Sequence, residues 1–360
     1  MQRNYGIEFL RIFAMTLVSC IHFLCYNNMW DNTDMPAYNR LFCDVLVTLT
    51  YCFVNIFVMM SGYLLCEKDF KISRITSTWM MVWITCVSTA AVVCMLCPRV
   101  FSINGAIRSV FPVLTASYWY IVSYFLLLLV TPFLNKAMAV CSANNLRNTL
   151  LGIGFLVLIF MNFNPLIDAE SYVGHDSALP WFCYMYAIGA YIRKYGIPRY
   201  NIIAIVGLLS FTILLSLKYF QIQLPQGIVV LTTSSLFSVL LAIALFSTFI
   251  KLGSNISSQN QSWLGGASLL GKSALLVYII QENYFFREWY WALLNPYQYK
   301  DSPCLILAWL FTIIVFWALA VIMYKWYELL HKLFMGRIEG TINKWGQNFF
   351  LINDNSKWQQ

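Results

Sequence analysis

The sequence predicts an all-α fold: a polytopic integral membrane bundle of about ten transmembrane helices, with both termini in the cytoplasm. Hydrophobic residues make up 60% of the chain and charged residues 11%, against about 45–50% and about 25% in soluble domains. The mean hydropathy is +0.67. Runs of about 20 apolar residues recur along the chain, and each is long enough to cross a hydrocarbon core about 30 Å thick. We expect one membrane domain over 1–330 and a short cytoplasmic tail over 331–360.

The predicted spans follow from these apolar runs, which polar or proline-containing segments separate. Examples are NNMWDNTDMP after the first run, EKDFK after the second and KYGIPR after the sixth. Charged residues interrupt the first run and no small-residue cleavage site follows it, so we predict an uncleaved helix and not a signal peptide. The ten predicted spans are 7–26, 41–65, 75–97, 117–135, 148–165, 179–193, 201–220, 228–250, 273–287 and 304–327.

The distribution of basic residues orients the bundle. With the N-terminus inside, 16 of the 23 basic residues fall in cytoplasmic segments and six in outer loops, while Arg11 lies within the first span. This asymmetry obeys the positive-inside rule and predicts a multi-pass protein of the inner or plasma membrane. The net charge of +8 then reflects topology and contact with anionic membrane lipid, so no nucleic-acid partner is expected.

Three ionisable side chains mark the first span, GIEFLRIFAMTLVSCIHFLCY. Arg11 and His22 are eleven residues apart, which places both on one helix face about 16 Å apart along the axis. Glu8 lies three residues before Arg11 and can pair with it. Ionisable groups inside a membrane span are costly and mark functional sites. A structurally bonded or interfacial histidine, and a buried structural Glu8–Arg11 pair, are the alternatives.

The second span ends in FVNIFVMMSGYLL, where Asn55 requires a polar partner or a cavity. Gly62, between Ser61 and Tyr63, permits a close approach of two helices. Ser61 and Tyr63 are candidate substrate contacts, and helix packing is the alternative role of this segment.

A basic turn follows the second span. In EKDFKISR, the three basic residues Lys68, Lys71 and Arg74 stand at three-residue spacing on one helical flank. Such a trio is able to hold the phosphates of a nucleotide-like donor. The positive-inside bias alone also accounts for these residues.

The segment before and within the ninth span contains two polar motifs. GASLLGKS satisfies the P-loop pattern literally, but a polar loop precedes it and an apolar helix follows, where a P-loop requires a preceding strand. We therefore expect no nucleotide-binding loop. Gln281, Glu282 and Asn283 form a polar cluster at the outer half of the span, and Glu282 and Asn283 are candidate substrate contacts.

The outer loop around Asp168, Glu170, His175 and Asp176 contains residue types that bind metal or sugar. A solvated acidic loop is the expected reading, and no metal cofactor is predicted.

Together these segments resemble the acyltransferase 3 family of integral membrane acyltransferases. The resemblance rests on GIEFLRIFAMTLVSCIH, FVNIFVMMSGYLL, the turn KISR, YWYIVSYFLLLLVTPFLN and GKSALLVYIIQEN, which occur in the family's order and with the ten-span plan cover nearly the whole chain. The family's ninth-span motif usually reads YLIH. Here it reads YIIQ, so Gln281 replaces an ionisable histidine and we assign it no proton-transfer role.

The resemblance implies transfer of an acyl group, commonly acetyl from acetyl-CoA, to a hydroxyl of a cell-surface or lipid-linked glycan. In that family the first-span arginine and histidine are the functional pair, matching Arg11 and His22, and Lys71 and Arg74 resemble a paired-arginine motif, with lysine at its first position. On this reading His22 is the general base, with Arg11 and Glu8 completing the catalytic set. The residues expected to bind acyl-CoA are Lys68, Lys71 and Arg74, and those expected to contact the acceptor are Ser61, Tyr63, Trp119, Glu282 and Asn283.

Two other functions remain as alternatives. A transporter or flippase of lipid-linked saccharides would also have many spans, but it more often shows internal repeats and helices broken at matching places, which this chain lacks. A glycan polymerase would be expected to carry large, arginine-rich outer loops. The sequence leaves open the acceptor, the acyl chain and whether the protein forms a homo-oligomer.

Overall fold

A computed structural model describes residues 4–31, 33–115, 117–161, 178–197, 199–224, 230–254 and 261–350. Across these ranges the secondary structure is helical, with no strand. Eight segments are long and apolar enough to cross a membrane, which confirms the predicted all-α, multi-pass membrane fold. The helices are α1 Tyr5–Cys25, α2 Ala37–Thr50, α3 Phe53–Leu65, α4 Ser73–Leu96, α5 Ile103–Val110, α6 Trp119–Val140, α7 Ala143–Gly154, α9 Ala178–Tyr195, α10 Tyr200–Tyr219, α11 Leu236–Ser254, α12 Gln261–Gln281, α13 Tyr284–Leu294, α14 Cys304–Leu330 and α15 Gly336–Phe350.

Two of the ten predicted spans are not among the eight. The span predicted at 148–165 corresponds to the short α7 and a π-helix over Phe155–Met161, and its end lies outside the described residues. The span predicted at 179–193 corresponds to α9, whose 18 residues end in a turn containing Arg193 and Lys194. The span predicted at 41–65 consists of α2 and α3, interrupted near Tyr51.

The predicted span at 273–287 has the wrong boundaries. The candidate span is Leu264–Gln281, and the chain breaks after it. Asn283 causes the break because its side chain accepts hydrogen bonds from the backbone N–H groups of Phe285 and Phe286, which starts the new helix α13. The polar cluster around Gln281 therefore lies at a junction of two helices and not in the middle of one.

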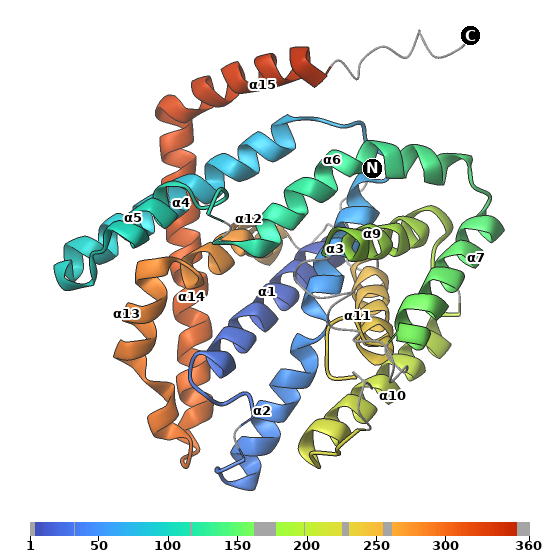
Figure 1. The fold of residues 1–360 in the computed structure, drawn as a ribbon, viewed down its shortest axis with the longest axis horizontal. Coiled ribbons are helices and arrows are strands. Elements are labelled where there is room, and N and C mark those ends of the chain that lie inside the picture. Colours follow the sequence, from blue (N-terminus) through green and yellow to red (C-terminus); the bar gives the residue numbers. More distant parts are fainter. Residues whose placement is uncertain are drawn as a thin grey trace.

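Helix α1 lies at the centre of the bundle and packs against α2, α3, α11, α12 and α14. In Figure 1, α15 lies at the upper end of the molecule, and the loop between α13 and α14 lies at the lower end. α1 and α12 run in the same direction, because Arg11 contacts Gly271 and His22 contacts Gln281.

Small residues bring α3 and α9 into close contact. A Cβ on Gly62 would lie 2.0 Å from the carbonyl oxygen of Tyr186, and a Cβ on Gly189 would lie 2.0 Å from that of Met59. Each glycine thus faces the backbone of the other helix, as small residues do at membrane helix contacts. Asn55 of α3 is fully buried and has polar partners, since it donates to the Thr233 carbonyl (2.7 Å) and accepts from the Trp181 indole (2.9 Å).

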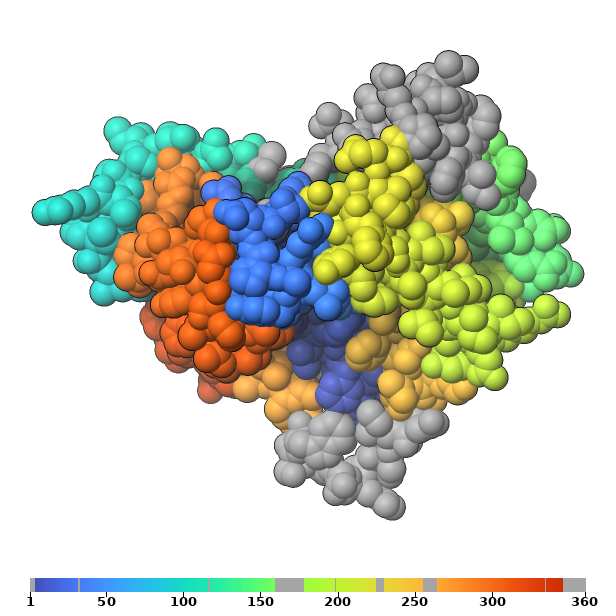
Figure 2. Space-filling model, turned by 90° about the horizontal axis from the view of Figure 1, so that it is seen from below, coloured from blue at the N-terminus to red at the C-terminus, as the bar shows by residue number. Residues whose placement is uncertain are grey.

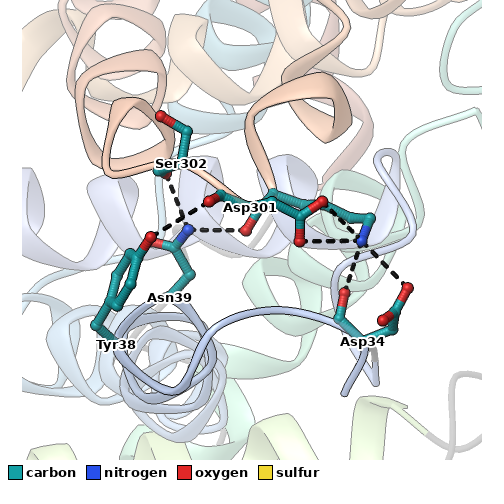
Figure 3. A network of polar contacts seen from close by, with 6 residues as sticks. Asp34, Tyr38, Asn39, Asp301 and Ser302 are labelled. Atoms are coloured by element: carbon teal, nitrogen blue, oxygen red, sulfur yellow. Dashed lines mark hydrogen bonds and ion pairs between the residues drawn. The ribbon is translucent and has the colours of Figure 1, made fainter.

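Polar contacts join the loop before α2 to the loop between α13 and α14, at the end of the molecule opposite α15 in Figure 1. The Lys300 ammonium lies 3.1 Å from the Asp34 carboxylate and 3.0 Å from that of Asp301, two of the residues labelled in Figure 3. These hydrogen bonds raise the pKa of Lys300 above its ordinary value. Asn39 of α2 donates to the carbonyls of Lys300 (2.8 Å) and Ser302 (2.9 Å). Figure 2 views this end, where α2 in blue lies beside α10 in yellow-green and the segment around α13 and α14 in orange.

The predicted cytoplasmic tail contains a helix. α15 turns sharply away from α14 in Figure 1 and packs against α4. The Thr76 hydroxyl donates to Asn343 (2.5 Å), and His331 lies 2.8 Å from the Glu339 carboxylate. These contacts connect the segment after the last span to the body of the bundle.

Candidate functional site

A cavity of about 930 Å³ penetrates the bundle, and both Arg11 and His22 line it. Its volume is typical of the larger ligand-binding clefts of proteins. Gly271 and Lys272 line it near Arg11, and Trp30, Trp181 and the 231–234 segment line it toward His22. The cavity therefore extends along α1 from Arg11 to His22, as the shared helix face of these two residues predicts.

The geometry at the Arg11 end of the cavity depends on Gly271. Arg11 donates to the Glu8 carboxylate (3.0 Å) and lies 3.5 Å from the Gly271 carbonyl of α12. A Cβ on Gly271 would lie only 2.0 Å from Glu8 Oε2. The missing side chain thus makes the room for the carboxylate, which in turn orients the guanidinium toward the cavity. The predicted Glu8–Arg11 pair is present, and α12 completes it.

At the other end, the neighbours of His22 hold both nitrogens of its imidazole. Nδ1 lies 2.8 Å from Gln281 Oε1, and Nε2 lies 3.2 Å from Glu282 Oε1. The Gln281 amide is fixed because its nitrogen donates to the Ser19 hydroxyl (2.6 Å), and Gln281 is fully buried. Its oxygen therefore faces Nδ1 as an acceptor, which favours a proton on Nδ1 and leaves Nε2 as the basic nitrogen.

A second layer of contacts surrounds Glu282. The Tyr26 hydroxyl donates to its carboxylate (2.5 Å), and the Arg287 guanidinium lies 3.7 Å from it. The ring of Tyr278 stacks on His22 with centroids 6.3 Å apart. The imidazole is thus held in place from α1, α12 and α13, with a carboxylate beside the nitrogen that would gain a proton.

Two of the predicted acceptor contacts, Ser61 and Trp119, line the cavity. The Ser61 hydroxyl donates to the Phe57 carbonyl (3.1 Å), and the Tyr124 hydroxyl bonds to Ser61. The other three, Tyr63, Glu282 and Asn283, are not among its lining residues. Tyr63 packs between the ring of Phe246 and the guanidinium of Arg193, and the buried Asn283 caps α13. Substrate contacts of Tyr63 and Asn283 remain predictions that the cavity does not support.

None of the three residues of the basic turn lines the cavity. Lys68 and Lys71 are exposed, and Arg74 donates to the Asp69 carbonyl (2.6 Å). Thr78, whose hydroxyl donates to the Arg74 carbonyl (2.7 Å), does line the cavity, so the turn flanks the site.

Sequence reasoning missed Lys272, which lines the cavity one residue from Gly271. The signal was available, since Lys272 belongs to the motif GASLLGKS. That motif lies inside α12 and not in a loop after a strand, so it forms no P-loop. As a helical residue, however, Lys272 adds a cation to the cavity near Arg11.

Two other sequence expectations concern metal binding. The loop containing Asp168, Glu170, His175 and Asp176 lies outside the described residues. Within the described ranges, no three His, Cys, Asp or Glu side chains lie together in a group suited to a metal ion.

Chemically, the cavity joins a cationic end to a basic end. Arg11 and Lys272 are able to hold an anionic group, and His22 is able to remove and return a proton. Aromatic and aliphatic side chains form the walls between these two ends, including Tyr120, Phe57 and Met15. Such walls suit an uncharged chain that connects an anionic group at Arg11 to a reacting group at His22.

Comparison with known proteins identifies the family of this chain. A search of curated proteins and a search of solved structures gave no match. A comparison with protein-family profiles matches the acyltransferase domain of the acyltransferase 3 family to residues 4–327, which is most of the chain. The matched range contains both ends of the cavity. The chain is therefore a multi-pass membrane protein that belongs to the acyltransferase 3 family.

Proposed function

We propose that this protein transfers an acyl group, with acetyl as the preferred group, from cytoplasmic acyl-CoA to a hydroxyl of a cell-surface or lipid-linked glycan. The observation that carries the proposal is the single cavity lined by Arg11 at one end and His22 at the other. One substrate enters from each side of the membrane, and the two meet in the cavity.

The cytoplasmic end of the cavity binds the donor. Acyl-CoA carries its phosphates on the nucleotide, and its acyl group at the end of a long pantetheine arm. Lys272 and Arg11 face the cavity, while Arg74, Lys71 and Lys68 flank it, so phosphates held at this end leave the arm free to extend inward. Arg11 acts as a donor contact or as a stabiliser of developing oxyanion charge.

The outer half of the cavity binds the acceptor. Trp119, Trp30 and Trp181 offer flat apolar surfaces, and Thr232 and Thr233 offer hydroxyl and backbone groups. Ser61 lies deeper in the same cavity. Such a mixture of aromatic faces and hydroxyls suits a sugar, whose rings are apolar on their faces and polar at their edges.

His22 performs the chemistry as general base. Its Nε2 removes the proton of the acceptor hydroxyl while the hydroxyl oxygen attacks the thioester carbonyl carbon. The tetrahedral intermediate collapses, the carbon–sulfur bond breaks, and the CoA thiolate takes the proton from His22. The products are an ester and free CoA. Glu282, 3.2 Å from Nε2, stabilises the imidazolium formed in this step, and general-base catalysis of this kind contributes about 10²- to 10⁴-fold.

Mass spectrometry of surface glycans tests this proposal. Cells that express the wild-type chain are expected to carry an added acyl mass, and cells that express a folded His22→Ala variant are expected to lack it. Normal acylation by that variant would refute the role of His22. Unchanged glycans together with accumulation of an unexported lipid-linked sugar in cells without the gene would instead support the transporter alternative.

A further inference from the structure

A second and smaller pocket lies behind Glu282, separate from the main cavity. Its volume is about 40 Å³, enough for about two or three water molecules and hence for one small polar group, but too small for a sugar ring. It is bounded by α4, α5, the start of α6, and α13. The lining residues are Cys86, Arg108, Ser109, Ser117, Tyr118, Glu282, Tyr284 and Arg287.

The electrostatic character of this pocket is cationic. Two guanidinium groups, those of Arg108 and Arg287, face a single carboxylate, Glu282. That carboxylate already accepts a hydrogen bond from Tyr26 and lies 3.2 Å from His22 Nε2. Arg108 is held only loosely, by a 3.4 Å contact to Asn104 and by the ring of Tyr284 at 5.8 Å. Its forked donors are therefore available to an anion.

A buried hydroxyl adds a further donor. Ser109 is 3% exposed, and its hydroxyl has no nitrogen or oxygen partner among the described residues, although it lies beside the Cys86 sulfur. A buried polar group without such a partner is costly unless a ligand or water satisfies it. Ser117 lines the same pocket. Arginine forks combined with hydroxyl donors are the usual recognition elements for phosphate oxygens.

The position of α5 sets the depth of this pocket in the membrane. Ile103, Ile107 and Val110 are exposed along α5, so this short amphipathic helix suits the membrane interface, where lipid headgroups lie. Gly105 lets α5 approach α13 closely, because a Cβ there would lie 2.4 Å from the ring of Phe285. Under the predicted orientation, α5 is on the outer side, so the pocket lies at the depth of outer-leaflet phosphates.

We propose that this pocket binds a phosphate group of the acceptor, with Arg108 and Arg287 as its ligands and Ser109 as a hydroxyl donor. The proposal rests on the function proposed above. Glu282 lines the pocket and also contacts the proposed base His22. A phosphate held by Arg108 and Arg287 thus lies next to the carboxylate that contacts the proposed base, and it anchors the acceptor beside the reacting centre.

Direct binding measurements test the assignment. The full chain is purified into nanodiscs of neutral phosphatidylcholine, and two probes are compared: polyprenyl phosphate in the nanodisc, followed by native mass spectrometry, and glucose 1-phosphate in solution, followed by calorimetry. We expect at least one probe to bind, with affinity about tenfold or more weaker in Arg108→Gln, since an arginine contact to a charged group is worth about that much. Arg108→Lys should restore part of the affinity.

Arg99→Gln is the matched control, because Arg99 is an exposed outer-side arginine that does not line the pocket. It should bind both probes as the wild type does. Binding of polyprenyl phosphate alone would support a lipid-linked acceptor, and binding of glucose 1-phosphate would support a soluble one. The assignment is overturned if neither probe binds, or if Arg108→Gln binds as tightly as the wild type.

The two proposals fail separately. Loss of glycan acylation in His22→Ala together with unchanged phosphate binding in Arg108→Gln would remove only the pocket assignment. Normal glycan acylation in His22→Ala together with Arg108-dependent phosphate binding would remove the proposed chemistry and retain the binding site. Acetyl-CoA affinity, measured on the same nanodiscs, should be the same in Arg108→Gln and in the wild type, because the pocket lies away from the donor end of the cavity.

Discussion

Replacing Gly271 with alanine should displace Glu8 and thereby disturb Arg11, without altering any charge. The added Cβ would lie 2.0 Å from Glu8 Oε2, whereas ordinary contact begins near 3.4 Å. The carboxylate must therefore move by about 1.4 Å, which breaks the 3.0 Å bond that orients Arg11. A misplacement of about 1 Å in a catalytic site can cost about 10²-fold in rate, or about 2.7 kcal/mol in transition-state stabilisation.

The assay is the acyl content of surface glycans, measured by mass spectrometry and normalised to the amount of protein that elutes as a single folded species in detergent. Gly265→Ala is the matched control, because Gly265 lies on the same helix and a Cβ there meets nothing within 4 Å. We expect Gly265→Ala to retain wild-type acylation and Gly271→Ala to lose about 10²-fold.

Wild-type activity in a folded Gly271→Ala protein would refute the reasoning, since it would mean that the position of the Glu8–Arg11 pair does not matter. Equal losses in both alanine variants would refute it in another way, because the effect would then come from the glycine content of α12 and not from the carboxylate.

Three further predictions follow from the contacts described above. Gln281→Leu removes the acceptor for His22 Nδ1 and should lower the rate of acyl transfer about 10²-fold while leaving acetyl-CoA affinity unchanged. Lys272→Gln should raise the KM for acyl-CoA about tenfold or more, whereas Lys68→Gln, outside the cavity, should raise it less. Gly62→Ala forces α3 from α9 and should cost about 1–3 kcal/mol of stability, measured as a lower Tm, whereas Gly152→Ala, which meets no neighbour, should not.

Each of these has a contradicting result. A wild-type rate in Gln281→Leu would mean that the tautomer of His22 is set elsewhere. If Lys68→Gln raised the KM for acyl-CoA more than Lys272→Gln, the donor phosphates would bind mainly at the basic turn. An unchanged Tm in Gly62→Ala would mean that α3 and α9 separate at little cost.

Hydropathy predicted most of the membrane helices because each span is a continuous run of about 20 apolar residues, which the sequence shows directly. The Glu8–Arg11 pair was predictable for the same reason, since two side chains three positions apart on one helix lie next to each other. The break after α12 also had a local signal that was missed: Asn283 is a favoured N-cap residue standing directly before YFFREWYW.

The partners of His22 were not predictable from the sequence. Gln281 and Ser19 are 262 residues apart, and they meet only because α1 and α12 pack in one particular register. The same holds for Gly271, whose importance comes from a carboxylate on another helix. Such contacts depend on helix packing between distant segments, which the local pattern of a single sequence does not reveal.

The parallel pairing of α1 and α12 makes the site a molecular ruler. Arg11 contacts Gly271 and His22 contacts Gln281, so an interval of about 16 Å on α1 lies beside one of about 15 Å on α12. Neither end can shift along the axis without breaking contacts at the other. On the proposed function, the ruler selects the donor by the length of the arm between its charged group and its thioester. Adding one residue to α1 between Arg11 and His22 would turn the imidazole about 100° away from Gln281. The imidazole would then lie on the wrong face of α1.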